Sequence, residues 1–193
     1  MFESPGLGTA GFRGITVLHE ATPGAYAARN TGIRMARAPI IGFTDADCTV
    51  DRDWAQAILV SMADPRTGAV IGQCRYPESA SPALKLLGAW ENAKTAYVLE
   101  RCPPAHRFAY ANNMAVRSWV FAELGPFEEW PRAADSELVH RLASRRPRTR
   151  TAYHPSMRVN HMEFTSARAR ARRLGLYTRT NARIEGFREL GLR

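Results

Sequence analysis

The sequence has little cysteine and no long apolar segment. Its three cysteines, Cys48, Cys74 and Cys102, form no Cys-x-x-Cys pair and leave an odd number, a pattern that predicts neither a disulfide framework nor a zinc site. No apolar run approaches the roughly 18–20 residues that a membrane-spanning helix needs. The first residues carry neither a basic region nor an apolar stretch, so a secretory signal peptide is not expected. We therefore expect a cytoplasmic, globular protein.

Negative charge is also scarce. The chain has 27 Lys and Arg residues against 18 Asp and Glu residues, a formal net charge of +9. Such a balance favours a polyanionic partner: nucleic acid, an anionic membrane or a phosphate-bearing substrate. Arginines gather near the carboxyl end, at Arg168, Arg170, Arg172 and Arg173. Because no aromatic residues alternate with them, a nucleic-acid partner is not expected. A peripheral contact with the inner face of the membrane and a solvated helix face both stay open.

Apolar segments alternate between the lengths typical of strands and of amphipathic helices. This alternation, with short connections, predicts an α/β fold in a chain that suits one domain. The run Ile40 to Phe43 is continuous, which is typical of a strand buried on both faces of a parallel sheet. The expected strands cover residues 15–18, 40–43, 69–72, 108–110 and 151–153, and the expected helices cover residues 25–38, 53–62, 81–97, 118–124 and 135–143.

Two of these helices carry further signals. The helix expected at 25–38 has a face of mostly small residues that predicts close packing on the sheet. The members of that face are Ala25, Ala28, Gly32 and Met35. Ser81 and Pro82 predict the start of the longest helix, because serine is a preferred N-cap and proline a preferred first helical residue. The apolar side of this helix would comprise Leu84, Leu87, Trp90 and Tyr97.

The triplet Asp45-Ala46-Asp47 directly follows the strand expected at 40–43. If the triplet is extended, residues i and i+2 point to the same side, and two carboxylates converge beyond the carboxyl end of the strand. Neighbouring carboxylates repel each other unless a cation lies between them, and Mg²⁺ or Mn²⁺ often joins carboxylates to substrate phosphates. The sequence therefore predicts a metal–diphosphate site. The simpler alternative is that Asp47 or Asp51 caps the following helix.

Two blocks of the sequence resemble family 2 glycosyltransferases. The first is GAYAARNTGIRMARAPIIGFTDADC, which resembles the family's Gly-x-x-x-Ala-Arg-Asn-x-Gly helix, apolar strand and Asp-Ala-Asp. The second is ANNMAVRSWVFAELGPFEEWPRAADSELVHRL, which is similar to the family's acceptor-side segment. Both blocks occur in the family's order. The matching positions are Gly24, Ala28, Arg29, Asn30, Gly32, Asp45 and Asp47, and then Asn112, Asn113, Gly125, Phe127, Glu129, Asp135, Glu137, Leu138, Arg141 and Leu142.

The resemblance implies a GT-A fold, which is a Rossmann-like mixed sheet flanked by helices. It also implies inverting transfer of a sugar from a nucleotide-diphospho-sugar donor to an acceptor hydroxyl. Asp45 and Asp47 would hold Mn²⁺ or Mg²⁺. His161 would be a further metal or diphosphate ligand, or would instead tie down the segment that follows it. The donor-binding residues implied by the resemblance are Arg29, Asn30 and Ala46.

Asp135 would be the general base, since a carboxylate within hydrogen-bond reach of the acceptor hydroxyl can remove its proton. The acceptor side would include Asn112, Asn113 and Glu137. Two of the implied roles have simpler alternatives. Arg29 is explained equally well by a salt bridge within the fold, and Glu137 by a favourable position near the start of a helix.

The chain departs from the family pattern in two places. The family's Glu-Asp pair at the base position is Ala134-Asp135 here, so a neighbour that could orient the base is missing. Relatives also begin with a strand, a helix and a second strand that recognise the nucleotide base, and we expect this N-terminal βαβ portion to be missing. We therefore expect a partial GT-A domain at 1–163 and a basic helical extension at 164–193.

Processive family members carry a Gln-x-x-Arg-Trp motif after the base, and none follows Asp135. A single-transfer enzyme is therefore expected. Its acceptor would be a saccharide, a lipid-linked molecule or a small molecule, and the chain could form a homo-oligomer. Two alternatives stay open at this point. One is a truncated or non-catalytic relative that acts as a binding subunit, and the other is a different metal–phosphate enzyme such as a nucleotidyltransferase.

Overall fold

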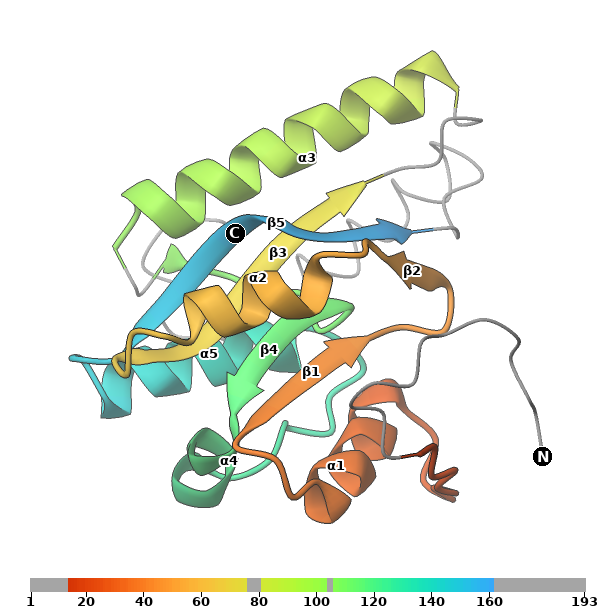
Figure 1. Cartoon of the computed structure of the whole chain (residues 1–193), viewed down its shortest axis with the longest axis vertical. Helices are drawn as coiled ribbons and strands as arrows, with labels where there is room; N and C mark the ends of the chain where they lie inside the picture. The colour runs from red at the N-terminus through yellow and green to blue at the C-terminus, as the bar shows by residue number, and fades with distance from the viewer. Residues whose placement is uncertain (1–13, 76–80, 104–105, 162–193) are drawn as a thin grey trace.

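The computed structural model describes residues 14–75, 81–103 and 106–161, and its centre is a mixed β-sheet (Figure 1). In this part of the chain the strand order is β1-β4-β3-β5-β2. Strands β3 and β5 are parallel, and the other neighbouring pairs are antiparallel. The expected α/β class with a mixed sheet is confirmed. The elements are α1 (Ala25–Met35), β1 (Ile40–Thr44), β2 (Cys48–Val50), α2 (Trp54–Ser61), β3 (Thr67–Arg75), α3 (Pro82–Arg101), β4 (Asn113–Arg117), α4 (Ser118–Leu124), α5 (Ala134–Arg145) and β5 (Arg150–His161).

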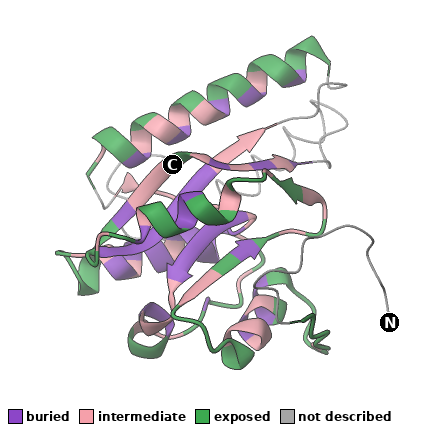
Figure 2. Cartoon of the chain, in the orientation of Figure 1, coloured by how far each residue is buried: buried purple, intermediate pink, exposed green. Residues whose placement is uncertain are grey.

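Helices pack on both faces of the sheet because successive residues of a strand point to opposite sides. In β3, Ala69 and Ile71 belong to the larger apolar cluster, which contains the buried side chains of α4 and α5. Val70, between them, belongs to a second cluster with Ala57 and Ile58 of α2. The central strands β3 and β4 are correspondingly the most buried parts of the sheet (Figure 2).

Strand β4 lies later in the chain than expected. Residues 108–110 form no strand, and β4 begins at Asn113, which is fully buried. Its Nδ2 donates to the carbonyl oxygens of Gln73 and Met157, both at 2.9 Å, and its Oδ1 accepts from Trp54 Nε1 at 2.9 Å. A polar side chain can start a buried strand when other elements supply all these partners. Nothing in the local sequence signals them.

Two expectations for the first strands are wrong. Residues 15–18 form no strand, and Ile15 and Val17 are 73% and 90% exposed. The run from Ile40 does form β1, but it is not buried on both faces of a parallel sheet. Within the described residues β1 ends the sheet, pairs only with the antiparallel β4, and buries only Phe43. A strand with a neighbour on one side leaves much of its surface uncovered.

Helix α1 buries a different face from the one expected. The inward residues are Tyr26, Ala27 and Asn30, whereas Met35 is 56% exposed. The Asn30 side chain explains this orientation. Its Nδ2 donates to the carbonyl oxygen of Phe127 at 2.9 Å, and its Oδ1 accepts from the Phe127 amide at 3.0 Å. Two hydrogen bonds of the Asn30 side-chain amide, rather than the packing of small residues, thus determine which face of α1 is buried.

Helix α3 begins as expected, since the Ser81 hydroxyl accepts a hydrogen bond from the Leu84 amide at 3.4 Å. The expected apolar side is wrong at Trp90 and Tyr97, which are 55% and 64% exposed. The buried side is instead Leu84, Gly88, Glu91, Thr95 and Leu99. Across the described ranges, no helix is long and apolar enough to span a membrane.

Strand β5 is much longer than the expected strand at 151–153, and it is irregular. It covers 12 residues and pairs with β3 in two stretches. The register shifts between Gly72 and Gln73, opposite Pro155. Because proline has no N–H to donate, it fits at such an irregularity. The second stretch carries β5 on to His161. The expected basic extension at 164–193 lies outside the described residues.

Gly72 is a position where the fold has no room for a side chain. A Cβ there would lie 2.0 Å from the Met157 carbonyl oxygen and 2.4 Å from Asn113 Nδ2. We expect Gly72→Ala to lower the free energy of unfolding by about 1–3 kcal/mol, as other overpacking changes do, measured by urea denaturation. Gly32→Ala is the matched control, because a Cβ at helical Gly32 meets nothing within 4 Å and should stabilise by up to about 1 kcal/mol. Equal effects of the two changes would contradict this packing.

Candidate functional site

The Asp45-Ala46-Asp47 segment forms a turn between β1 and β2. The amide of Cys48 donates to the Asp45 carbonyl oxygen at 3.0 Å, so the expectation of an extended triplet is wrong. The turn gives the two carboxylates different partners. Asp45 forms an ion pair with Arg29 of α1, and Asp47 lies beside His161 of β5. The structure thus contains the salt bridge that was the simpler alternative for Arg29.

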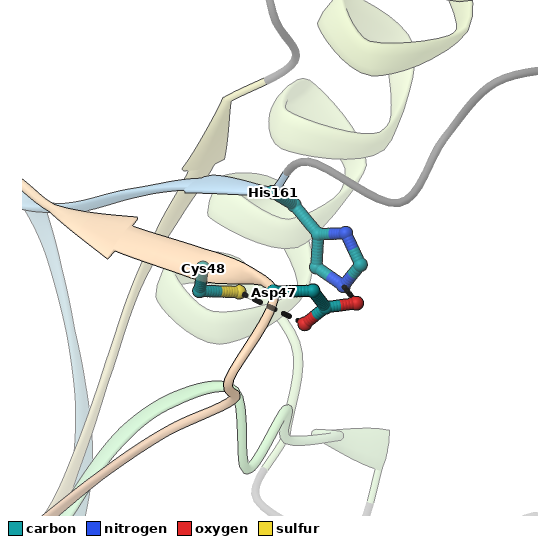
Figure 3. Close-up of side chains that lie close together, drawn as sticks. All are labelled: Asp47, Cys48 and His161. Carbon is teal, nitrogen blue, oxygen red and sulfur yellow. Dashed lines mark hydrogen bonds and ion pairs between the residues drawn. The ribbon is translucent and has the colours of Figure 1, made fainter.

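Asp47, Cys48 and His161 bring three potential metal-ligating groups together (Figure 3). His161 Nε2 lies 3.8 Å from Asp47 Oδ2, and Cys48 Sγ lies 3.8 Å from Asp47 Oδ1. One donor atom from each residue falls within 4.8 Å of the others. His161 is 5% exposed, and burial raises the pKa of the Cys48 thiol to about 11. This is the strongest candidate metal site in the described part of the chain.

The spacing of these groups fits a divalent cation. Two ligands at about 2.1 Å from one ion can lie at most about 4.2 Å apart. The 3.8 Å between Asp47 Oδ2 and His161 Nε2 is within that limit, and it is too long for a direct hydrogen bond. A carboxylate oxygen and an imidazole nitrogen together suit Mn²⁺ and its neighbours in the first transition row, whereas Mg²⁺ prefers oxygen ligands alone.

Asp135 lies in the first turn of α5 and is 7% exposed. Its Oδ2 accepts a hydrogen bond from the Ala111 amide at 2.9 Å, and its Oδ1 accepts one from the Ser136 amide at 2.8 Å. Burial raises the pKa of Asp135, and these hydrogen bonds, together with the Tyr26 hydroxyl and the Arg29 charge, oppose the increase. A buried carboxylate with a raised pKa is a stronger proton acceptor than an exposed one.

Tyr26 and Arg29 connect the turn to Asp135. The Tyr26 hydroxyl lowers the pKa of the Asp135 carboxyl group, and burial raises the pKa of the tyrosine itself well above its usual value. The Arg29 guanidinium lies over the Tyr26 ring, 5.3 Å from its centroid, and pairs with Asp45. One turn of α1 thus brings together residues from the two sequence blocks that resemble family 2 glycosyltransferases.

The other residues expected at the site occupy varied places. Asn30 and Asn113 are buried and bind the backbone of neighbouring segments, as described above. Asn112 is half-buried, with its Oδ1 3.7 Å from Cys74 Sγ. Glu137, in the first turn of α5, pairs with Arg141 at 3.0 Å. Ala46 is exposed in the turn, where only its backbone offers polar groups.

Sequence reasoning missed two residues of this site, Tyr26 and Cys48. Tyr26 precedes Arg29 by three residues, a spacing that places the two on the same side of a helix. That spacing was an available signal. Cys48 follows Asp47 directly, but its role depends on β2 pairing with the distant β5, where Cys48 lies opposite His161. No local pattern could have shown that pairing.

The curated proteins with similar sequences include glycosyltransferases. Glycosyltransferase AglE of Haloferax volcanii is 26% identical over 113 residues, which cover 58% of this chain and 36% of that protein. The pre-mycofactocin glycosyltransferase of Mycobacterium tuberculosis is 27% identical over 159 residues, which cover 80% of this chain and 33% of that protein. The chain therefore spans about a third of the length of these curated relatives.

Solved structures support the same fold. A mannosyltransferase of Pyrobaculum calidifontis, PcManGT, solved with GDP-Man and Mn²⁺, superposes with a TM-score of 0.55 at 22% identity, covering 79% of this chain and 41% of that one. A mycobacterial protein superposes with a TM-score of 0.52 at 16% identity, covering 84% of this chain and 52% of that one. These neighbours have the GT-A fold. The sequence model "Glycosyl transferase family 2" matches residues 9–125. With both sequence blocks, the fold and this match in agreement, the chain belongs to glycosyl transferase family 2.

Proposed function

We propose that the chain transfers one sugar at a time from a nucleotide-diphospho-sugar to an acceptor hydroxyl, with inversion and with the help of Mn²⁺ or Mg²⁺. Family membership supports the class of reaction. Because the chain spans about a third of its curated relatives, the activity, the substrates and the partners of the whole protein belong to this proposal.

The observation that carries the proposal is the meeting of Asp47 and His161. Asp47 directly precedes β2 and His161 ends β5, and the antiparallel pairing of these strands brings Asp47 Oδ2 to 3.8 Å from His161 Nε2. The site lies at the carboxyl end of β5, which is parallel to β3. This is the edge at which open α/β sheets bind ligands. The donor diphosphate would be held here, with Asp45 and Arg29 on the adjoining turn and helix.

The chain's own chemical step is proton removal by Asp135. The Asp135 carboxylate takes the proton of the acceptor hydroxyl, and the oxygen forms a bond to the anomeric carbon. The bond from that carbon to the donor's diphosphate oxygen breaks on the opposite face and leaves its electron pair with the diphosphate, so the configuration inverts. The Ala111 and Ser136 amides orient the carboxylate, which compensates for alanine at the position before the base.

A divalent ion bound at Asp47 and His161 would supply positive charge that stabilises the departing diphosphate. The presence of Mn²⁺ and GDP-Man in the PcManGT structure supports this arrangement by analogy of fold. We assign Asp45, Arg29, Asn30 and Ala46 to the donor side as part of the same proposal.

The acceptor would be a saccharide, a lipid-linked molecule or a small molecule. Asn112, Asn113 and Glu137 form the proposed acceptor side. Asn113 would act by fixing the backbone, since its amide is already fully engaged. A homo-oligomer and a peripheral membrane contact through the basic residues 168–173 are further parts of the proposal, and nucleic acid is not a proposed partner.

Calorimetric titration with nucleoside diphosphates tests the proposal directly. We expect at least one of UDP, GDP and dTDP to bind in the presence of Mn²⁺, and we expect EDTA to abolish the binding. Release of the same diphosphate from its sugar donors, increased by an acceptor panel, would then identify the donor. Metal-dependent binding without release from any donor favours the alternative of a non-catalytic binding subunit. Binding that is indifferent to EDTA would contradict the metal site.

A further inference from the structure

Cys48 shares one side of the sheet with His161. The two residues are direct partners in the antiparallel pairing of β2 with β5, and directly opposed residues send their side chains to the same side. Figure 3 shows the Cys48 sulfur and the His161 ring on the two sides of the Asp47 carboxylate. A thiol therefore adjoins the pair of residues that the proposed function assigns to the catalytic cation.

The separations suit a third ligand. Cys48 Sγ lies 3.8 Å from Asp47 Oδ1, as His161 Nε2 does from Asp47 Oδ2. A zinc ion takes sulfur at about 2.3 Å and nitrogen or oxygen at about 2.0–2.2 Å, so a sulfur and an oxygen on one ion lie at most about 4.5 Å apart. Small side-chain rotations could bring one oxygen, one nitrogen and one sulfur around a single ion.

This set of donors discriminates between ions. Mg²⁺ prefers oxygen ligands, and Mn²⁺ binds most weakly in the first-row series, whereas Co²⁺ and Zn²⁺ bind more tightly and accept thiolate. Three protein ligands with a fourth position open to water or substrate is also the usual arrangement of a catalytic zinc site. The cysteine spacing in the sequence gave no hint of such a site, because its other ligands are a turn carboxylate and a distant histidine.

We propose that Asp47, Cys48 and His161 together form a site for a thiophilic divalent ion of the Zn²⁺ and Co²⁺ class. Such an ion displaces the thiol proton to solvent on binding and competes with Mn²⁺ or Mg²⁺. Cys48 thus determines which metal the enzyme carries, and zinc lowers the rate of transfer by occupying the position of the catalytic cation. The inference rests on the metal site of the proposed function.

Cobalt titration of the full chain without nucleotide tests the inference, because thiolate bound to Co²⁺ gives a charge-transfer band in the near ultraviolet. We expect the band in the parent and its loss in Cys48→Ser. Cys74→Ser and Cys102→Ser are matched controls that should keep it, since both are half-buried cysteines that do not belong to the Asp47–Cys48–His161 group. Zn²⁺ affinity should fall by at least about tenfold in Cys48→Ser, while Mn²⁺ affinity stays unchanged.

The outcomes separate this inference from the proposed function. Cobalt binding to the parent without the band, or with an equal band in Cys48→Ser, overturns the role of Cys48 and leaves the Asp47–His161 site in place. Failure of Mn²⁺, Co²⁺ and Zn²⁺ to bind the parent at all overturns both.

Discussion

Asp135→Asn is expected to lower kcat for sugar transfer by about 10²–10⁴-fold, the usual contribution of a positioned general base. Asparagine keeps the size of the side chain but cannot accept the proton of the acceptor hydroxyl. Nucleotide binding in the presence of Mn²⁺ should persist, because Asp135 is not among the proposed metal ligands. The measurement pairs a diphosphate-release assay with calorimetric titration of the same preparations.

The pH dependence of kcat gives an independent readout of the same group. Asp135 acts as a base only when it is deprotonated, so activity falls as pH drops through its pKa. Burial raises that pKa, which moves the loss of activity to a higher pH than an exposed aspartate would give. Tyr26→Phe removes the hydroxyl group that lowers the pKa of Asp135, so it should shift the acidic limb of the profile to still higher pH.

Asp64→Asn is the matched control for the Asp135 experiment. Asp64 precedes β3 and pairs with Arg66 and Arg150 at the opposite end of the sheet from the site. This change should leave kcat and its pH profile at parental values. An Asp135→Asn protein with parental kcat would exclude the base assignment.

Asp47→Ala is expected to weaken Mn²⁺ binding by at least about 100-fold, because even outer-shell partners of a metal ligand are worth about 10–100-fold in affinity. Binding of the nucleoside diphosphate should be lost with the metal. The physical reason is the position of Asp47, whose carboxylate is one of the two proposed Mn²⁺ ligands and lies 3.8 Å from the other, His161 Nε2 (Figure 3). Manganese electron paramagnetic resonance measures the free ion directly.

His161→Ala should reproduce the metal loss, while Asp53→Asn should not. Asp53 is an exposed acidic residue shortly after the turn, and its side chain makes no capping hydrogen bond to α2. It therefore controls for a general change of local charge. If the Asp47→Ala protein binds Mn²⁺ as the parent does, the cation site lies elsewhere.

Much of the fold followed from local sequence patterns. The helix α2 was predicted correctly, since it covers Trp54–Ser61 within the expected range 53–62. The N-cap of α3 at Ser81 was also correct. Such features depend on residues within one or two helical turns of each other, so they can be predicted from the local sequence. The strand β1 was located for the same reason, although its degree of burial depends on neighbours.

Two of the errors, the start of β4 and the buried face of α1, come from contacts with residues that are distant in the sequence. The start of β4 depends on Asn113 finding partners in β3, β5 and α2. The inward face of α1 depends on Asn30 meeting Phe127, which lies 97 residues away. A polar side chain can be buried when other groups of the protein form hydrogen bonds with it. A prediction from hydrophobic periodicity places every polar side chain on the solvent-facing side, so it misses such residues. Both asparagines make buried hydrogen bonds to distant backbone groups, and their donor-side and acceptor-side roles stay part of the proposal.

For the candidate site, the sequence by itself determined the chemical groups available: an aspartate pair after a strand, a later aspartate at a helix start, and a histidine near the end of the sheet. Only the tertiary structure decided their grouping. The turn after β1 separates Asp45 from Asp47, and the pairing of β2 with β5 sets Cys48 opposite His161. Residue type fixes what an atom can bind, whereas backbone hydrogen bonds between distant strands fix which atoms can bind the same ion.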